Sequence, residues 1–282
     1  MKHLDERGYD WVVWPGNEAA DRPEAGERVA LRPHDAKDHR AVLEEWIEGE
    51  AQVRMDVDGR VRRVNPKELR KCYRVDASLT DEHRGRVLLV GETTDFRSAA
   101  RAQVFSADVV LEIGSSYGDT STLLRRHAKH TLHFDNGAEC VEEASRRYPE
   151  INFENVDCFL NAALVKEKGK GCTVVFIDIG GSRAARDQLE MLVWAQLNLA
   201  PKFIVLKSRL LFLALQQRQG EGDAAGRPLS YIGRWLTEAA AEGEGEGEGA
   251  QESSLTTKDR KRASRSGERK KTKKEGAPSS EV

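Results

Sequence analysis

The chain lacks the long apolar runs and the apolar leader that mark membrane and secreted proteins. Its longest apolar run, LLFLAL at 210–215, is far shorter than the roughly 18 residues needed to cross a bilayer. The first ten residues, MKHLDERGYD, are polar and acidic, and so match neither a signal peptide nor a transit peptide. We therefore expect an intracellular protein of the nucleus or the cytoplasm, without membrane association.

Cysteine is also scarce. The chain has four cysteines, and no two of them stand in the C-x-x-C spacing that is typical of zinc clusters. We therefore predict no metal site, and we interpret the cysteines as reduced, buried apolar residues of an intracellular protein. They are Cys72, Cys140, Cys158 and Cys172.

Charge, by contrast, is abundant and unevenly distributed. Of the 282 residues 33% are charged, and the formal net charge is only -2. Residues 238–252 hold six glutamates and no cation, whereas residues 258–282 hold ten Lys and Arg against four acids. Such segments bury too little apolar surface to offset the entropy of ordering, so residues 240–282 are predicted to be a disordered tail. Its basic block is typical of a nuclear-import signal or a non-specific nucleic-acid contact, or it is simply a solvated extension.

The N-terminal third divides into two parts. Residues 1–24 show no stable period and are interpreted as an extension. Residues 25–76 contain short strand-like runs, an Asp58-Gly59 hairpin signal and a short helix beginning near Pro66. This pattern resembles the small SH3-like and Tudor-like β modules that occur beside nucleic-acid or chromatin enzymes.

Residues 86–239 alternate between strand and helix patterns, which favours a doubly wound α/β fold with a mostly parallel sheet. RVLLV at 86–90 and the stretch 96–104 are expected to lead into the first strand. The helix at 209–218 is apolar nearly all round and should be buried. The expected strands are 109–114, 131–135, 151–156, 173–179 and 203–207. The expected helices are 120–128, 138–148, 159–167, 184–199, 209–218 and 229–239.

The motif that carries chemistry is VVLEIGSSYGDTS at 109–121. An apolar strand containing Glu112 turns through Gly114 and Gly118 into a helix, and glycines there allow a ligand to approach the backbone. In α/β sheets ligands bind at such strand ends. The spacing is neither the G-x-G-x-x-G of dinucleotide folds nor a G-K-[ST] phosphate loop.

This acid-x-Gly-x-x-x-Gly motif resembles the first motif of class I, Rossmann-like S-adenosylmethionine-dependent methyltransferases. The later strands support the resemblance, because they end in Asp135, Asp157 and Asp178. In that family the acid after the second strand binds the ribose, and the one after the third strand contacts the adenine. The resemblance implies S-adenosyl-L-methionine as cofactor. The implied cofactor-binding residues are Glu112, Gly114, Ser115, Gly118, Asp135, Asn136, Asp157 and Cys158.

Each acid also has a structural alternative. Asp135 can cap the following helix, and Asp157 can be an ordinary turn residue. Glu112 can instead pair with Arg101 or His133 beneath the loop.

The candidate catalytic residues are Asp178 and Lys207, at the ends of the fourth and fifth strands. The pair resembles part of the Lys-Asp-Lys set of RNA ribose 2′-O-methyltransferases, in which a lysine helps to deprotonate the hydroxyl. The chain has no match for that family's first lysine or closing glutamate, and a plain ion pair is the alternative. DIGG at 178–181 departs from the Asn/Asp-Pro-Pro motif of amino N-methyltransferases. A metal-dependent, catechol-type enzyme would need Asp187 as a second ligand.

Residues 220–239 lack the reversed pair of strands with which the family usually ends, so we expect a sheet abbreviated at its C-terminal end. The sequence favours a methyltransferase acting on RNA or protein. The alternative is a non-catalytic reader or scaffold with a degenerate cofactor fold.

Overall fold

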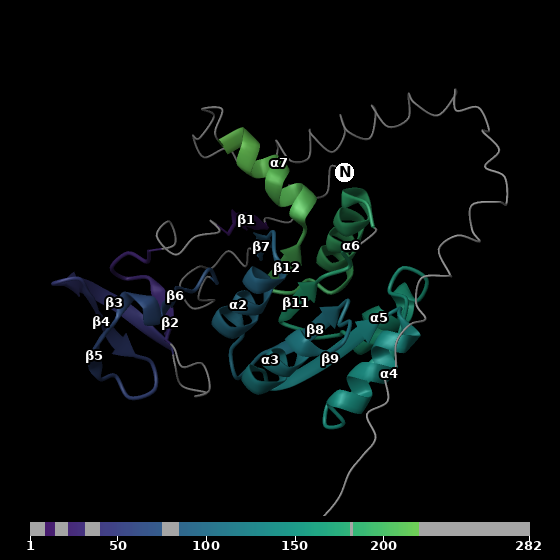
Figure 1. Cartoon of the computed structure of the whole chain (residues 1–282), viewed down its shortest axis with the longest axis horizontal. Helices are drawn as coiled ribbons and strands as arrows, with labels where there is room; N and C mark the ends of the chain where they lie inside the picture. The colour runs from purple at the N-terminus through teal and green to yellow at the C-terminus, as the bar shows by residue number, and fades with distance from the viewer. Residues whose placement is uncertain (1–8, 15–21, 32–39, 75–84, 181–182, 220–282) are drawn as a thin grey trace, which may run out of the picture. The chain divides into compact units, whose positions relative to one another are not determined.

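The computed structural model describes residues 9–14, 22–31, 40–74, 85–180 and 183–219 (Figure 1). These residues all belong to one compact unit, which spans 1–237. The predicted helix at 229–239 and the predicted disordered tail lie outside the described residues. So do most of the N-terminal extension and the region where the closing pair of strands was sought.

The larger sheet has seven strands, and every neighbouring pair of them is parallel. Its spatial order is β1-β7-β12-β11-β8-β9-β10. Read from the other edge, β10-β9-β8-β11-β12 has the 3-2-1-4-5 order of a Rossmann-like fold, with β7 in sixth place. The strands are β1 (Asp10–Val13), β7 (Arg86–Val90), β8 (Val109–Ile113), β9 (His130–Asp135), β10 (Phe153–Asn155), β11 (Val174–Ile177) and β12 (Phe203–Lys207).

Six α-helices connect or follow these strands in the described part of the chain. Because crossovers between parallel strands are right-handed, α2, α3 and α4 cover one face and α5 and α6 the other. Figure 1 shows α2 and α3 as neighbours, and the two helices are in contact. The chain leaves β8 and β11 toward opposite faces, which makes their carboxyl ends the expected ligand site. The helices are α2 (Thr93–Gln103), α3 (Asp119–His127), α4 (Ala138–Arg147), α5 (Ala162–Lys168), α6 (Ala185–Asn198) and α7 (Arg209–Gln219).

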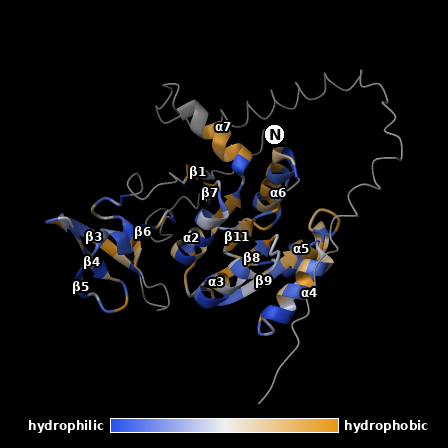
Figure 2. Cartoon of the chain, viewed as in Figure 1, coloured by the Kyte–Doolittle hydropathy of each residue, from blue (hydrophilic) through white to orange (hydrophobic). Residues whose placement is uncertain are grey.

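The core of this domain follows from near-continuous apolar strands, as expected when a sheet is covered on both faces. All four residues of β11 are 0% exposed. Phe176 on β11 packs edge-on against Phe96 of α2, with ring centroids 5.2 Å apart. Figure 2 shows hydrophobic colour at β11 and α7 and mainly hydrophilic colour along α4.

Most of the elements predicted in the α/β region are confirmed, but its N-terminal edge corrects the predictions. RVLLV at 86–90 is not a lead-in but β7, a buried strand between β12 and β1. Residues 10–13, from the presumed extension, form the edge strand β1. The sheet therefore has seven strands, because β7 and β1 occupy the positions beyond β12. The expected abbreviation concerned residues 220–239, which lie outside the described residues.

Helix α7 is another correction. Leu211 and Phe212 are buried, but Leu210 is 60% and Leu213 is 44% exposed. The described part of the chain packs only one face of α7, against β7. An apolar composition all round a helix was therefore not sufficient evidence for its burial.

The second sheet is antiparallel and has five strands in the order β5-β4-β3-β2-β6. The predicted hairpin at Asp58-Gly59 and the helical turn at Pro66 are confirmed. A second hairpin was missed: Glu48 and Gly49 join β3 to β4, both with positive φ as tight hairpins require. The elements are β2 (Arg28–Leu31), β3 (Arg40–Ile47), β4 (Glu50–Met55), β5 (Val61–Val64), the 3-10 helix η1 (Pro66–Glu68) and β6 (Leu69–Lys71).

The antiparallel sheet contacts the C-terminal end of α2. The buried guanidinium of Arg40 donates hydrogen bonds to the carbonyl oxygens of Ala102 and Val104. The Gln103 side chain accepts from the Tyr73 amide at 2.7 Å and donates to the Lys71 carbonyl at 2.8 Å. These contacts satisfy the last carbonyls of the helix.

Candidate functional site

The glycine turn after β8 packs closely against the ends of β9 and β11. Gly114 has a φ of +90°, and a Cβ at this position would lie 2.0 Å from the carbonyl oxygen of Asp178. The amides of Gly114 and Ser115 both donate to the Phe134 carbonyl, at 2.8 and 3.1 Å. Only glycine fits there, so the motif's first glycine is explained by close packing as well as by any ligand.

The rest of the loop leads into α3 and contains an unsatisfied hydroxyl. Gly118 has a φ of +82° and precedes the helix, where a Cβ would meet the Phe153 ring at 2.8 Å. The Ser115 side chain is buried, and its Oγ has no hydrogen-bond partner among the described residues. Leaving a buried hydroxyl unpaired costs about 1–3 kcal/mol, which a polar ligand group at this loop would recover.

Asp135 ends β9 and ties the glycine loop to the start of α4. Its Oδ2 accepts from the Ser116 amide at 2.7 Å, and its Oδ1 accepts from the Gly137 amide at 2.8 Å. Gly137 is the N-cap residue of α4, so this bond reaches the start of the helix without capping its first turn. Each carboxylate oxygen still has capacity for a further bond, so hydroxyl donors can share this group.

Asp157 follows β10 and organises the next turn. Its Oδ1 accepts from the amides of Phe159 and Leu160 at 2.9 and 3.2 Å. Burial opposes its charged form, but these amides, the Asn136 side chain and the Arg183 charge together hold its pKa below the usual value. Asp157 therefore does act as a turn residue, the alternative considered from the sequence. Asn136, which follows Asp135 in the chain, also connects Asp157 with the neighbouring strand end.

Glu112 lies beneath the loop and not on its surface. Only 1% of the residue is exposed, and its Oε2 accepts from Ser121 Oγ at 2.5 Å and lies 2.7 Å from His133 Nδ1. Of the two partners considered from the sequence, His133 is the one found. The Glu112 carboxylate therefore links β8, α3 and β9 under the loop.

The two candidate catalytic residues meet as predicted from their adjacent strand ends. Lys207 Nζ lies 2.9 Å from Asp178 Oδ2, and both side chains are about one-fifth exposed. Asp178 Oδ1 also accepts weakly from the Gly180 amide, at 3.4 Å. The ion-pair alternative is therefore realised, and an ammonium in this pair is a hydrogen-bond donor that has no free electron pair for a proton.

Sequence reasoning missed two side chains that border the site. Asp119, in the first turn of α3, accepts from Arg97 at 2.9 Å and from the Tyr148 hydroxyl at 3.1 Å. The guanidinium of Arg183 lies 4.7 Å from the centre of the Phe159 ring and 4.0 Å from Asp157. One signal was available, because Arg183 is the first cation after Asp178 in the chain.

Asp187 lies in the first turn of α6 and was considered as a metal ligand. Within the described ranges, no group of three or more His, Cys, Asp or Glu residues is placed to hold a metal ion. Nor is any helix there long and apolar enough to cross a membrane.

Cysteine reactivity should follow burial. Burial raises the pKa of Cys158 to about 12 and that of Cys172 to about 11, and it also raises the pKa of the fully buried Cys72. At pH 8 these thiols stay protonated and enclosed, whereas Cys140 is partly exposed. We expect iodoacetamide to modify Cys140 first, as measured by peptide mass spectrometry. Equal labelling of Cys158 in the folded chain would contradict this burial.

Comparison of the whole sequence with models of protein families and with curated proteins finds no match. What the chain does is therefore inferred from the geometry of this site.

Proposed function

We propose that the chain is an S-adenosylmethionine-dependent methyltransferase of the class I type, acting on RNA or protein. The observation that carries the proposal is the alignment of the glycine loop with carboxylates at successive strand ends. Ser116 of the loop donates to Asp135, and the Asn136 side chain helps to hold the pKa of Asp157 low. This row stands beside the point where β8 and β11 diverge, which is where α/β sheets bind ligands.

The residues present fit this cofactor better than a dinucleotide. Asp135 can accept from ribose hydroxyls, and the buried Ser115 hydroxyl lacks a partner in the described structure. A dinucleotide would bring its pyrophosphate to the N-terminus of α3. Asp119 stands there with 45% of its side chain exposed, and its charge opposes a second anion.

The assigned roles are mostly those of positioning. The cofactor, when bound, supplies an electrophilic methyl group. Gly114 and Ser115 would leave room for the cofactor at the loop. Asp135 would accept hydrogen bonds from its ribose hydroxyls, and Asp157 and Asn136 would lie beside its base. Methyl transfer is an in-line displacement, so holding the acceptor in line contributes a large part of the rate.

Lys207 and Asp178 are assigned to the acceptor side. Asp178 packs against the glycine turn through its carbonyl, and its carboxylate orients the Lys207 ammonium. An ammonium held there can donate a hydrogen bond to an acceptor oxygen and fix its direction. To act as a general base, as the ribose 2′-O alternative requires, it must first lose its own proton.

Replacing Lys207 tests this assignment. For Lys207→Met we expect methyl transfer to fall by ~100-fold, because a misplaced acceptor costs a displacement reaction on the order of that factor. Affinity for S-adenosylhomocysteine should stay within about threefold. Labelled-methyl incorporation into fractionated RNA and protein measures the first quantity, and calorimetry the second. Lys202→Met, at the other end of β12, is the matched control. Undiminished turnover in the Lys207 variant would remove the residue from the mechanism.

The strand order of the five-stranded sheet favours the interpretation of this region as an accessory SH3-like module. Its β6-β2-β3-β4-β5 order, with a 3-10 helix just before β6, is the arrangement expected of such a barrel. The second candidate function is a non-catalytic reader that uses this module. Binding of S-adenosylhomocysteine without methyl incorporation into any fraction would favour the reader.

The proposal as a whole is tested by titrating the full chain with S-adenosylhomocysteine in a calorimeter. We expect saturable one-to-one binding. Absence of binding would exclude the methyltransferase assignment, whatever the acceptor.

A further inference from the structure

One edge of the antiparallel sheet is rich in cations. Residues 60–74 contain seven Lys and Arg against one acid, Glu68. Not all of these cations are available, because Arg70 is buried and Arg74 is paired with Asp108. The exposed ones are Arg60, Arg62, Arg63 and Lys67, which lie on or beside β5 and η1.

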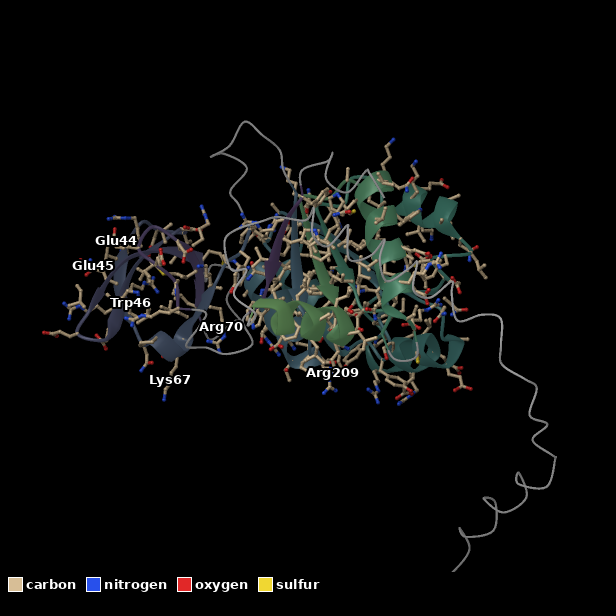
Figure 3. The ribbon with its side chains drawn as sticks, turned by 90° about the horizontal axis from the view of Figure 1, so that it is seen from above. Glu44, Glu45, Trp46, Lys67, Arg70 and Arg209 are labelled. Atoms are coloured by element: carbon tan, nitrogen blue, oxygen red, sulfur yellow. The ribbon has the colours of Figure 1, made fainter. Side chains whose placement is uncertain are left out.

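Two of these exposed cations are not neutralised by the described part of the protein. The side chains of Arg63 and Lys67 form no ion pair with any carboxylate of the described residues. Lys67 projects from the ribbon in Figure 3. Arg60 and Arg62 share the single carboxylate of Asp58, at 3.8 and 3.3 Å, and their side chains are 81% and 52% exposed. The edge therefore has an excess of positive charge.

The two adjacent glutamates of β3 do not cancel this excess. Glu44 and Glu45 are on β3, and β4 separates that strand from β5. Both glutamates are already bonded, Glu44 to Arg54 and Gln52, and Glu45 to Gln52. Figure 3 labels the two glutamates on β3, apart from Lys67.

The geometry of the cations indicates the shape of the ligand. β5 is an edge strand, so alternate side chains project from opposite faces, and those two apart on one face are separated by about 7 Å. Arg62 and Arg63 thus point to different faces, while Arg60 is in the hairpin and Lys67 is in η1. These cations do not converge on one point, as the site of a single small anion would require. An extended polyanion fits them.

Exposed apolar side chains lie among the cations. Val57 and Val61, in and beside the β4–β5 hairpin, are 54% and 44% exposed. A surface that combines Arg with apolar patches suits a polymer offering both phosphates and apolar sugar and base edges. Arg forms bidentate bonds with phosphate and with carboxylate oxygens alike, so we favour phosphodiesters because of the apolar side chains beside the cations.

We propose that the β5–η1 edge, residues 60–67, binds the phosphate backbone of a nucleic acid. Salt-sensitive binding follows, because each neutralised phosphate releases counterions. The surface lies in the antiparallel sheet and not at the glycine loop, so it stands whether or not the chain transfers methyl groups.

The test uses the full chain and fluorescence anisotropy with a labelled RNA duplex and a DNA duplex of equal length. We expect the double variant Arg63→Gln/Lys67→Gln to bind roughly tenfold more weakly, with a salt slope lower by about 1.8 for two lost phosphate contacts. The control is Arg125→Gln/Arg126→Gln, which removes two exposed cations from the last turn of α3. It should leave affinity within about twofold.

The outcomes separate this surface from the basic tail. An unchanged affinity and slope in the β5 variant would assign the binding to the tail and overturn the proposal. Equal losses in both double variants would show a mere net-charge effect and also overturn it. So would displacement by polyglutamate at matched charge, which would indicate an acidic protein partner. If the β5 variant alone weakens binding, the duplex bound more tightly identifies RNA or DNA as the source of the backbone.

Discussion

Replacing Asp135 with alanine should lower the affinity for S-adenosylhomocysteine by at least ~100-fold. Hydrogen bonds to a charged group contribute about 1.5–3 kcal/mol each, and two ribose hydroxyls would lose theirs. The substitution also frees the amides of Ser116 and Gly137, which Asp135 holds at 2.7 and 2.8 Å, so the loop becomes less well ordered for binding. Calorimetric titration of the full chain measures the effect.

A nearby acid provides the matched control. Asp119→Asn removes the same charge from the first turn of α3, where Arg97 and Tyr148 contact the side chain. We expect its affinity to stay within about threefold of the native value. If the two variants bind equally, the loss reflects loop charge and not ribose contacts. Native affinity in Asp135→Ala would exclude the ribose role altogether.

Replacing Gly114 with alanine should be among the most damaging single changes to this fold. The new Cβ would lie 2.0 Å from the Asp178 carbonyl oxygen, at a φ of +90°. Positive φ costs a residue with a Cβ roughly 1–2 kcal/mol, and overpacking adds about 1–3 kcal/mol. We expect the free energy of unfolding to fall by about 3 kcal/mol or more, as measured by urea denaturation.

A substitution at Gly171 distinguishes the cost of positive φ from the cost of overpacking. It has a comparable φ of +82°, but an added Cβ meets nothing within 4 Å. Gly171→Ala should therefore cost only the conformational part, about 1–2 kcal/mol. Similar losses in the two variants would mean that Asp178 can move away from the turn, and that Gly114 is required for its φ alone.

The elements around the glycine motif were predictable because local pattern and tertiary burial agree there. β8, β11 and β12 are apolar runs bounded by turn residues, and the structure has these three strands and β9 within two residues of the prediction. β10 is shorter than expected, at Phe153–Asn155, and lies at the edge of the sheet. An edge strand has one neighbour fewer, so its pairing ends sooner than its composition suggests.

The candidate site was predicted as a set of residues, but not as a set of contacts. The acids at strand ends follow from sequence, since the carboxyl ends of parallel strands meet at one edge. The different role of each acid does not follow from sequence. Glu112 is enclosed beneath the loop, whereas Asp135 is at its surface, and this difference depends on which face of the sheet α3 covers.

The sequence by itself determined the alternation of strand and helix, the glycine turn and the row of acids, because these depend on neighbours in the chain. Only the tertiary structure decided that β7 and β1 complete the sheet beyond β12 and that His133 is the partner of Glu112. An apolar run predicts that a strand will be buried, but it does not predict which other strand will pair with it. That choice is made by long-range packing, to which residues distant in sequence contribute together.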